Sequence, residues 1–127
     1  MIPTHPYIAA LSTRFGGILS PGTHAPDGRA CALEVESIAR GRTWSDTPIT
    51  LPDLRPLNDG SWPSDQAHTE AIVPVVLALW DWADWTPERR IAWVMRVAAR
   101  TISEVLPPML RLIGLHAEAD RCTTEGT

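Results

Sequence analysis

The clearest helical pattern of the chain lies in residues 86–106, which read TPERRIAWVMRVAARTISEVL. Thr86 and Pro87 suit the N-cap and the first helical position, so a helix is predicted to begin there. On one side of this helix, cationic and aromatic side chains recur at the spacing i, i+4, i+7, i+11, which places them within a narrow arc. This side, called here the Arg/Trp stripe, consists of Arg89, Trp93, Arg96 and Arg100.

The opposite side of the same helix is apolar and is predicted to face the core. Pro107 and Pro108 interrupt the pattern, and a short fourth helix is expected around residues 109–119. The small polar residues from 123 to 127 are expected to fray. The predicted core-facing residues are Ile91, Val94, Met95, Ala98, Ile102 and Val105.

Two more helices are predicted upstream of this segment. The first runs from about residue 28 to residue 40, with Asp27 as N-cap, Gly41 in a left-handed conformation after its end, and Glu36 on its solvent side. The second runs from about residue 65 to residue 82, is kinked or split by Pro74, and is apolar around most of its circumference. Closely spaced prolines predict irregular structure in residues 1–27 and 43–65, although the apolar residues 7–11 leave open an extended piece or a short helical turn.

These elements predict an all-α fold with three main helices, a short fourth helix and long irregular, proline-rich segments. The helix at residues 65–82 is expected to supply the centre of the core. A length of 127 residues favours a single domain over residues 1–127.

Composition excludes several classes of protein. All eleven basic residues are arginine, so a catalytic or Schiff-base lysine and a Walker A phosphate loop are absent. A net charge of −4 argues against sequence-independent nucleic-acid binding by the whole protein. The first residues lack the basic and apolar regions of a signal peptide, and no run is long enough to span a membrane, so a cytoplasmic location is expected. We predict that Cys31 and Cys122 are free thiols.

The Arg/Trp stripe can bind an anionic ligand, a nucleic acid or an acidic protein surface through cation–π and bidentate contacts. Alternatively, Asp81 and Asp84 pair with these arginines within the chain. Trp82 and Trp85, which cannot both enter one core with Trp80, extend the predicted binding surface toward a protein partner or a second copy of the chain.

A second constellation combines residue types that serve as metal ligands or in acid–base chemistry. If the loop after Gly41 folds back along the first predicted helix, it brings Ser45 and Asp46 near His24, Cys31 and Glu34. We take His24, Glu34 and Asp46 as candidate catalytic residues. Their spacing matches no metal signature, and neither a metal nor another cofactor is predicted.

Some of these residues also belong to short motifs that resemble a group of small bacterial and phage proteins without an assigned activity. The motifs are Gly22-Thr-His24, Ala30-Cys31-Ala-Leu-Glu34, Gly41, Trp44-Ser45-Asp46-Thr-Pro48 and Asn58-Asp59. They cover about a quarter of the chain, while the longer proline-rich stretch and the tryptophan-rich second helix depart from the pattern. The resemblance implies a shared structural unit and a phage or prophage origin, but no activity.

From these patterns we expect a small interaction factor that binds a protein partner through Arg89, Trp93, Arg96, Arg100, Trp82 and Trp85. Whether the chain is an enzyme stays open, and the sequence favours a non-enzymatic role. One alternative is a small metal-dependent or acid–base enzyme that uses His24, Glu34 and Asp46. Another is a self-associating scaffold. The identity of the partner and the order of residues 43–65 are left open by the sequence.

Overall fold

The computed structural model describes residues 4–22 and 28–125, and this part of the chain is helical without a β-strand. The all-α fold class is therefore confirmed. The chain divides into two compact units, Met1–Ala83 and Asp84–Thr127, each described here by itself. The single domain proposed for residues 1–127 stays a prediction. None of the described helices is both long and apolar enough to cross a membrane.

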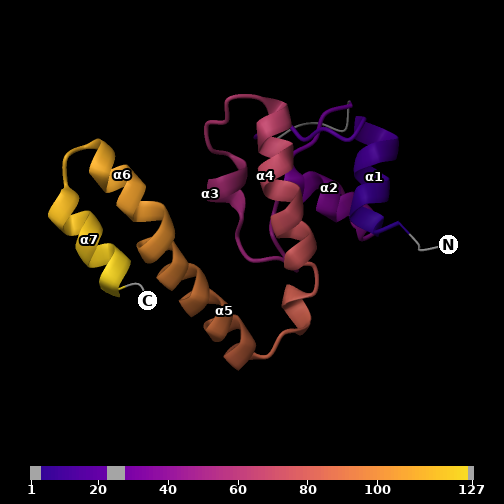
Figure 1. Cartoon of the computed structure of the whole chain (residues 1–127). Helices are drawn as coiled ribbons and strands as arrows, with labels where there is room; N and C mark the ends of the chain where they lie inside the picture. Colours follow the sequence, from indigo (N-terminus) through magenta and orange to yellow (C-terminus); the bar gives the residue numbers. More distant parts are fainter. Residues whose placement is uncertain (1–3, 23–27, 126–127) are drawn as a thin grey trace. The chain divides into compact units, whose positions relative to one another are not determined.

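The first unit is built around a short buried helix, α2 (Ala32–Ala39), which packs against α1 (Pro6–Phe15), α3 (Arg55–Asn58) and α4 (Asp65–Ala78). Figure 1 shows α2 between α1 and α4. Every residue of α2 from Ala32 to Ser37 is buried, as is its N-cap Cys31. The prediction that residues 65–82 form the centre of the core was therefore wrong, because that place belongs to α2.

Helix α2 also begins later than predicted. Its N-cap is Cys31 rather than Asp27, because the side chain of Glu34 accepts the backbone N–H of Cys31 at 2.8 Å. Such a bond satisfies one of the donors that a helix leaves free at its start. Gly41 follows the helix with a φ of 75°, in the left-handed region predicted for it.

Helix α1 includes the apolar residues 7–11, for which the sequence left open an extended piece or a short helical turn. It lies within residues 1–27, a segment that was expected to be irregular. Pro6 stands at its first position, where a missing N–H costs nothing, and the ring of His5 accepts the N–H of Tyr7 at 3.1 Å. Gly16, with a φ of 64°, ends the helix. The prolines and glycines of this region therefore frame a helix instead of preventing one.

Helix α4 begins at the predicted residue, with Ser64 as N-cap accepting the N–H of Ala67 at 3.0 Å. It continues through Pro74 and ends at Ala78, and a short 3-10 turn, η1 (Trp82–Asp84), follows. Between α2 and α4, helix α3 is the one helical element of the proline-rich segment 43–65. The buried apolar residues of α4 and its C-cap, which pack in the core, are Ile72, Val76 and Leu79.

The second unit is a helical arm followed by a helix that folds back along it. The arm consists of α5 (Pro87–Arg100), the π-helical turn η2 (Thr101–Val105) and α6 (Leu106–Leu112). Helix α7 (His116–Glu125) packs against α6 and η2, as Figure 1 shows. The start of α5 was predicted correctly, since the side chain of Thr86 accepts the N–H of Arg89 at 3.2 Å.

The end of this unit differs from the predicted short fourth helix over 109–119. Pro107 and Pro108 lie in the first turn of α6, where proline is tolerated, rather than separating two helices. The actual break comes at Gly114, with a φ of 83°. Helix α7 then reaches Glu125, so most of the tail that was expected to fray is helical.

Candidate protein-interaction surface

Helix α5 presents the Arg/Trp stripe on one side, and part of the stripe is engaged within the second unit. The guanidinium carbon of Arg89 lies 3.8 Å from the ring centroid of Trp85. The rings of Trp85 and Trp93 meet edge to face, with centroids 6.5 Å apart. This arrangement is a cation–π and aromatic cluster that stabilises the start of the helix. Trp85, singled out from the sequence as a binding residue, therefore has a structural contact as well.

The remaining stripe arginines are exposed. Arg100 pairs with Glu104, one helical turn further on, at 3.2 Å, and both side chains are largely in solvent. Such exposed pairs contribute little stability. No ion pair joins Asp84 to Arg96 among the residues that the structure describes. Of the predicted stripe, Arg96 is thus the member that stays available for an external anion.

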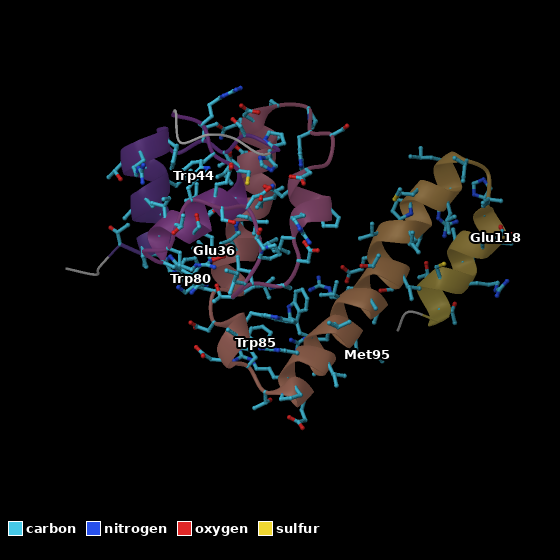
Figure 2. The ribbon with its side chains drawn as sticks, turned by 180° about the vertical axis from the view of Figure 1, so that it is seen from behind. Glu36, Trp44, Trp80, Trp85, Met95 and Glu118 are labelled. Atoms are coloured by element: carbon cyan, nitrogen blue, oxygen red, sulfur yellow. The ribbon has the colours of Figure 1, made fainter. Side chains whose placement is uncertain are left out.

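The opposite side of the arm is also exposed, which the sequence did not predict. The large side chains of this side, called here the apolar face, were expected to lie in the core, yet within the second unit they are between 38% and 66% exposed. Figure 2 shows the labelled Met95 projecting from α5. Within the second unit, helix α5 packs substantially only against η2, its own continuation. The apolar face consists of Ile91, Val94, Met95, Ile102 and Val105.

This exposure is concentrated in the second unit. Of the thirteen exposed large hydrophobic residues in the described part of the chain, ten lie between residues 91 and 115. The other three, Ile18, Ile49 and Leu57, are scattered over the first unit. Scattered apolar residues are ordinary on protein surfaces, whereas a contiguous group marks an interaction site. The missed signal was the absence of large apolar residues from 116 to 127, the segment that follows the arm, which leaves it little with which to cover this side of the helix.

The candidate catalytic residues lie in different settings. Glu34 is fully buried, and its carboxylate holds the start of α2 through the Cys31 N–H. Asp46 is half-buried in the loop that follows α2. His24 lies outside the residues that the structure describes. Glu34 therefore has a structural role as a helix cap, while the joint action of the three residues stays a prediction.

The loop after Gly41 folds back along α2, which is the arrangement on which the constellation of candidate residues depended. The N–H of Ser45 donates to the hydroxyl of Ser37 at 3.3 Å, and the hydroxyl of Thr50 donates to Glu36 at 3.1 Å. Trp44 packs its ring against that of Phe15, with centroids 5.9 Å apart. The Trp44-Ser45-Asp46 motif is thus part of the packing around α2.

Glu36, which the sequence pattern predicted to face solvent, has a buried carboxylate that binds several side chains of this region. Glu36 is 1% exposed and forms ion pairs with Arg40, at 2.7 Å, and with Arg42. The guanidinium of Arg40 also lies over the ring of Trp80, 3.7 Å from its centroid, and donates to the Trp80 carbonyl at 2.7 Å. Figure 2 shows Glu36 and Trp80 in this region. The contacts join α2 to the end of α4 and are structural.

The thiol of Cys31 is poorly suited to nucleophilic chemistry. Burial raises its pKa to about 12, and the charge of Glu34 adds to the shift, although the N–H of Glu34 and the side chain of Asn58 oppose it. A thiol in this environment stays protonated at neutral pH. Both cysteines are free, as predicted.

Within residues 4–22 and 28–125, no group of three or more His, Cys, Asp or Glu side chains lies close enough to share a metal ion. The same residues enclose no ligand-sized cavity.

Comparison of the chain with protein-family models, with curated proteins and with solved structures gave no match. The resemblance to small bacterial and phage proteins, with the origin that it implies, stays a prediction.

Proposed function

We propose that the protein is a small interaction factor that binds another protein chain through the apolar face of α5. The observation that carries this proposal is the exposure of the five large hydrophobic residues of this face, which are between 38% and 66% exposed within the second unit. Together they expose on the order of several hundred Å² of apolar surface, a size at which patches on soluble proteins are often functional. A phage or prophage accessory role is compatible with this function and rests on the resemblance alone.

The environment of α5 supports the proposal. Isolated helices of about 12–15 residues are marginal in water, and most helical stability in proteins comes from packing of an amphipathic face. Helix α5 has 14 residues and an apolar face that no described element of its own unit covers. A partner that covers this face stabilises the helix and removes the apolar surface from water.

The Arg/Trp stripe has a secondary role in this proposal. Arg96 and Arg100 lie on the side of the helix away from the apolar face, so they act on a partner bound to that face through their charge rather than by contact. Charges outside the buried contact chiefly affect the rate and specificity of association, whereas buried apolar anchors carry most of the affinity. The stripe thus favours partners with acidic surfaces without providing the main contact.

Replacing two residues of the apolar face, Ile91→Gln together with Met95→Gln, is expected to weaken partner binding by about 100-fold or more. Each apolar side chain contributes on the order of 1.5–3 kcal/mol when buried, and the sum exceeds the ~2.7 kcal/mol that a 100-fold change requires. The measurement is quantitative capture of partners from a lysate of the source cells by the tagged full-length chain, with circular dichroism to check that the variant is folded.

Ile49→Gln is the matched control, because Ile49 is 67% exposed, like Met95 at 66%, but lies in the first unit. It should leave capture unchanged. The double change Arg96→Glu and Arg100→Glu should weaken capture by only about tenfold, as expected for charges that steer association without direct contact. A wild-type chain that retains no protein more strongly than the Ile91→Gln, Met95→Gln chain would overturn the proposal.

A further inference from the structure

The Arg/Trp stripe carries positive charge that α5 itself does not balance. The positions three and four residues from Arg96 are its neighbours on the helix surface, and none of them is acidic. They are Ala92, Trp93, Ala99 and Arg100. Arg96 and Arg100 instead form a like-charge pair at the spacing i, i+4, which destabilises a helix. Within the described residues of the second unit, the exposed carboxylate of Glu104 pairs with Arg100 and stands against both guanidinium groups.

Arg89 extends this positive charge toward the start of the helix. It stands in the first turn of α5, where the helix dipole disfavours a cation. Its guanidinium carbon lies 3.8 Å from the ring centroid of Trp85, and this cation–π contact offsets part of the cost. A guanidinium that stacks through its face keeps the N–H groups along its edge for an anion. Because Arg89 is exposed, it retains donors for a ligand although one of its faces is engaged.

The three arginines lie along one line of the helix. At about 100° per residue they fall within an arc of about 40°, and they span ~17 Å of the helix axis. All three belong to the α-helical segment Pro87–Arg100, before the π-helical turn begins. Charges in such a line suit a ligand whose own charges recur along its length, as the phosphates of a nucleic acid do.

Aromatic rings accompany these arginines and narrow the choice of ligand. Trp85 and Trp93 are half-buried, meet edge to face, and stand beside Arg89. The bases of single-stranded nucleic acids stack on aromatic rings and on guanidinium planes. The carboxylates of an acidic protein surface provide no such planar rings. The alternation of arginine with tryptophan therefore favours a single-stranded nucleic acid over an acidic protein.

From these observations we infer that the Arg/Trp stripe binds single-stranded nucleic acid, with Arg89, Arg96 and Arg100 on phosphates and a base stacked at Trp85 and Arg89. The negative charge of the chain does not reside in this unit. Residues 1–83 contain five arginines and nine acidic residues, whereas residues 84–127 contain six of each. The inference goes beyond the proposed function, because it concerns the opposite side of α5 and a ligand of another chemical class.

The test is fluorescence anisotropy of a labelled single-stranded thymidine oligonucleotide titrated with the purified full-length chain. The wild type is expected to bind with a Kd in the micromolar range at about 50 mM salt. A tenfold rise in salt should weaken binding by about 100-fold, because three phosphate contacts give a slope of about −2 in log K against log salt. Arg96→Glu with Arg100→Glu should weaken binding by about 100-fold at the lower salt, since each charge-assisted contact contributes about tenfold or more.

Arg14→Glu with Arg29→Glu is the matched control, because both arginines are exposed in the first unit and the change in charge is the same. It should weaken binding by less than about threefold, because charges that do not touch the strand act only through a screened field. Circular dichroism checks the folding of each variant. If the Arg96→Glu, Arg100→Glu chain is unfolded, Arg96→Gln with Arg100→Gln replaces it, because this change removes the like-charge pair without adding charge.

A wild-type chain that does not bind the oligonucleotide at about 50 mM salt would overturn the inference. Equal losses of affinity in the two double variants would do so too, because binding would then follow the charge of the whole chain. Poly-glutamate that competes as well as unlabelled oligonucleotide at equal charge would overturn the assignment to nucleic acid and identify an acidic protein surface as the ligand. The capture experiment on Ile91 and Met95 uses the other side of α5, so the proposed function stands or fails separately.

Discussion

Glu36→Ala is expected to lower the free energy of unfolding of the protein by about 3–5 kcal/mol. Glu36 is 1% exposed, and its carboxylate accepts hydrogen bonds from Arg40, Arg42 and Thr50. Removal of one member of a buried ion pair leaves the other charge without compensation, which costs several kcal/mol. The loss is aggravated because Nε of Arg42 is already buried without a hydrogen-bond partner among the described residues. Urea unfolding followed by circular dichroism measures the change.

The matched control for Glu36 is Asp53, whose carboxylate pairs with Arg55 at 2.9 Å in a setting where both side chains are 49% exposed. Asp53→Ala should cost less than about 1 kcal/mol, as is typical of solvent-exposed ion pairs. Equal losses in the two variants would show that the Glu36 network does not join α2 to the end of α4 as described.

The two cysteines are expected to differ by at least ~1000-fold in their rate of reaction with a thiol reagent at pH 8. Cys31 is fully buried and burial raises its pKa to about 12, whereas Cys122 is partly accessible on α7. With a pKa of about 12, only about one Cys31 thiol in 10,000 is ionised at pH 8, and the thiolate is the reactive form. Reaction with a disulfide reagent, with the labelled residue identified by mass spectrometry, measures both rates.

The pH dependence of this reaction follows from the direction of the shift. A raised thiol pKa keeps the group protonated, so the rate at Cys31 should rise about tenfold per pH unit from pH 8 toward 11 while the protein stays folded. Cys122→Ser isolates the signal of Cys31, and denaturant provides the rate of the exposed thiol. Rapid labelling of Cys31 in the folded Cys122→Ser protein at pH 8 would contradict the burial of this thiol at the start of α2.

The parts of the fold that could be predicted from the sequence are those determined by local signals. Thr86 and Pro87 define the start of α5, and Asp65 begins α4 as expected, because capping and proline preferences act within one helical turn. Helix α1 was missed because the prolines and glycines around residues 6–17 were interpreted as helix breakers. In the structure they stand at the ends of the helix, where these residue types are favoured.

The burial of polar residues could not be predicted in the same way. Glu36 lies on a side of α2 that the sequence pattern places in solvent, and its partners Arg42 and Thr50 come from the loop beyond the helix. Only the tertiary path of that loop explains the burial of Glu36. Similarly, Glu34 has the residue type of an acid–base group but serves as a capping side chain, because Cys31 rather than Asp27 precedes the helix.

The surface of α5 was anticipated in part. The division of the helix into a cationic, aromatic side and an apolar side follows from a 3.6-residue period and needs no tertiary information. Whether an apolar side is covered depends on the rest of the chain, and within the second unit α7 packs on α6 and η2 instead of on α5. The sequence therefore singled out α5, but emphasised Arg96 and Arg100 where the exposed Ile91 and Met95 now carry the proposal.

Amide hydrogen exchange along α5 in the full-length chain tests the burial of its apolar face against another chain most directly. Exchange followed by mass spectrometry compares the purified chain alone with the chain recovered together with the protein that it captures. If another protein chain covers residues 91–105, protection of this segment is higher in the complex while that of α2 stays constant. Protection of residues 91–105 that is the same in both samples would contradict the account.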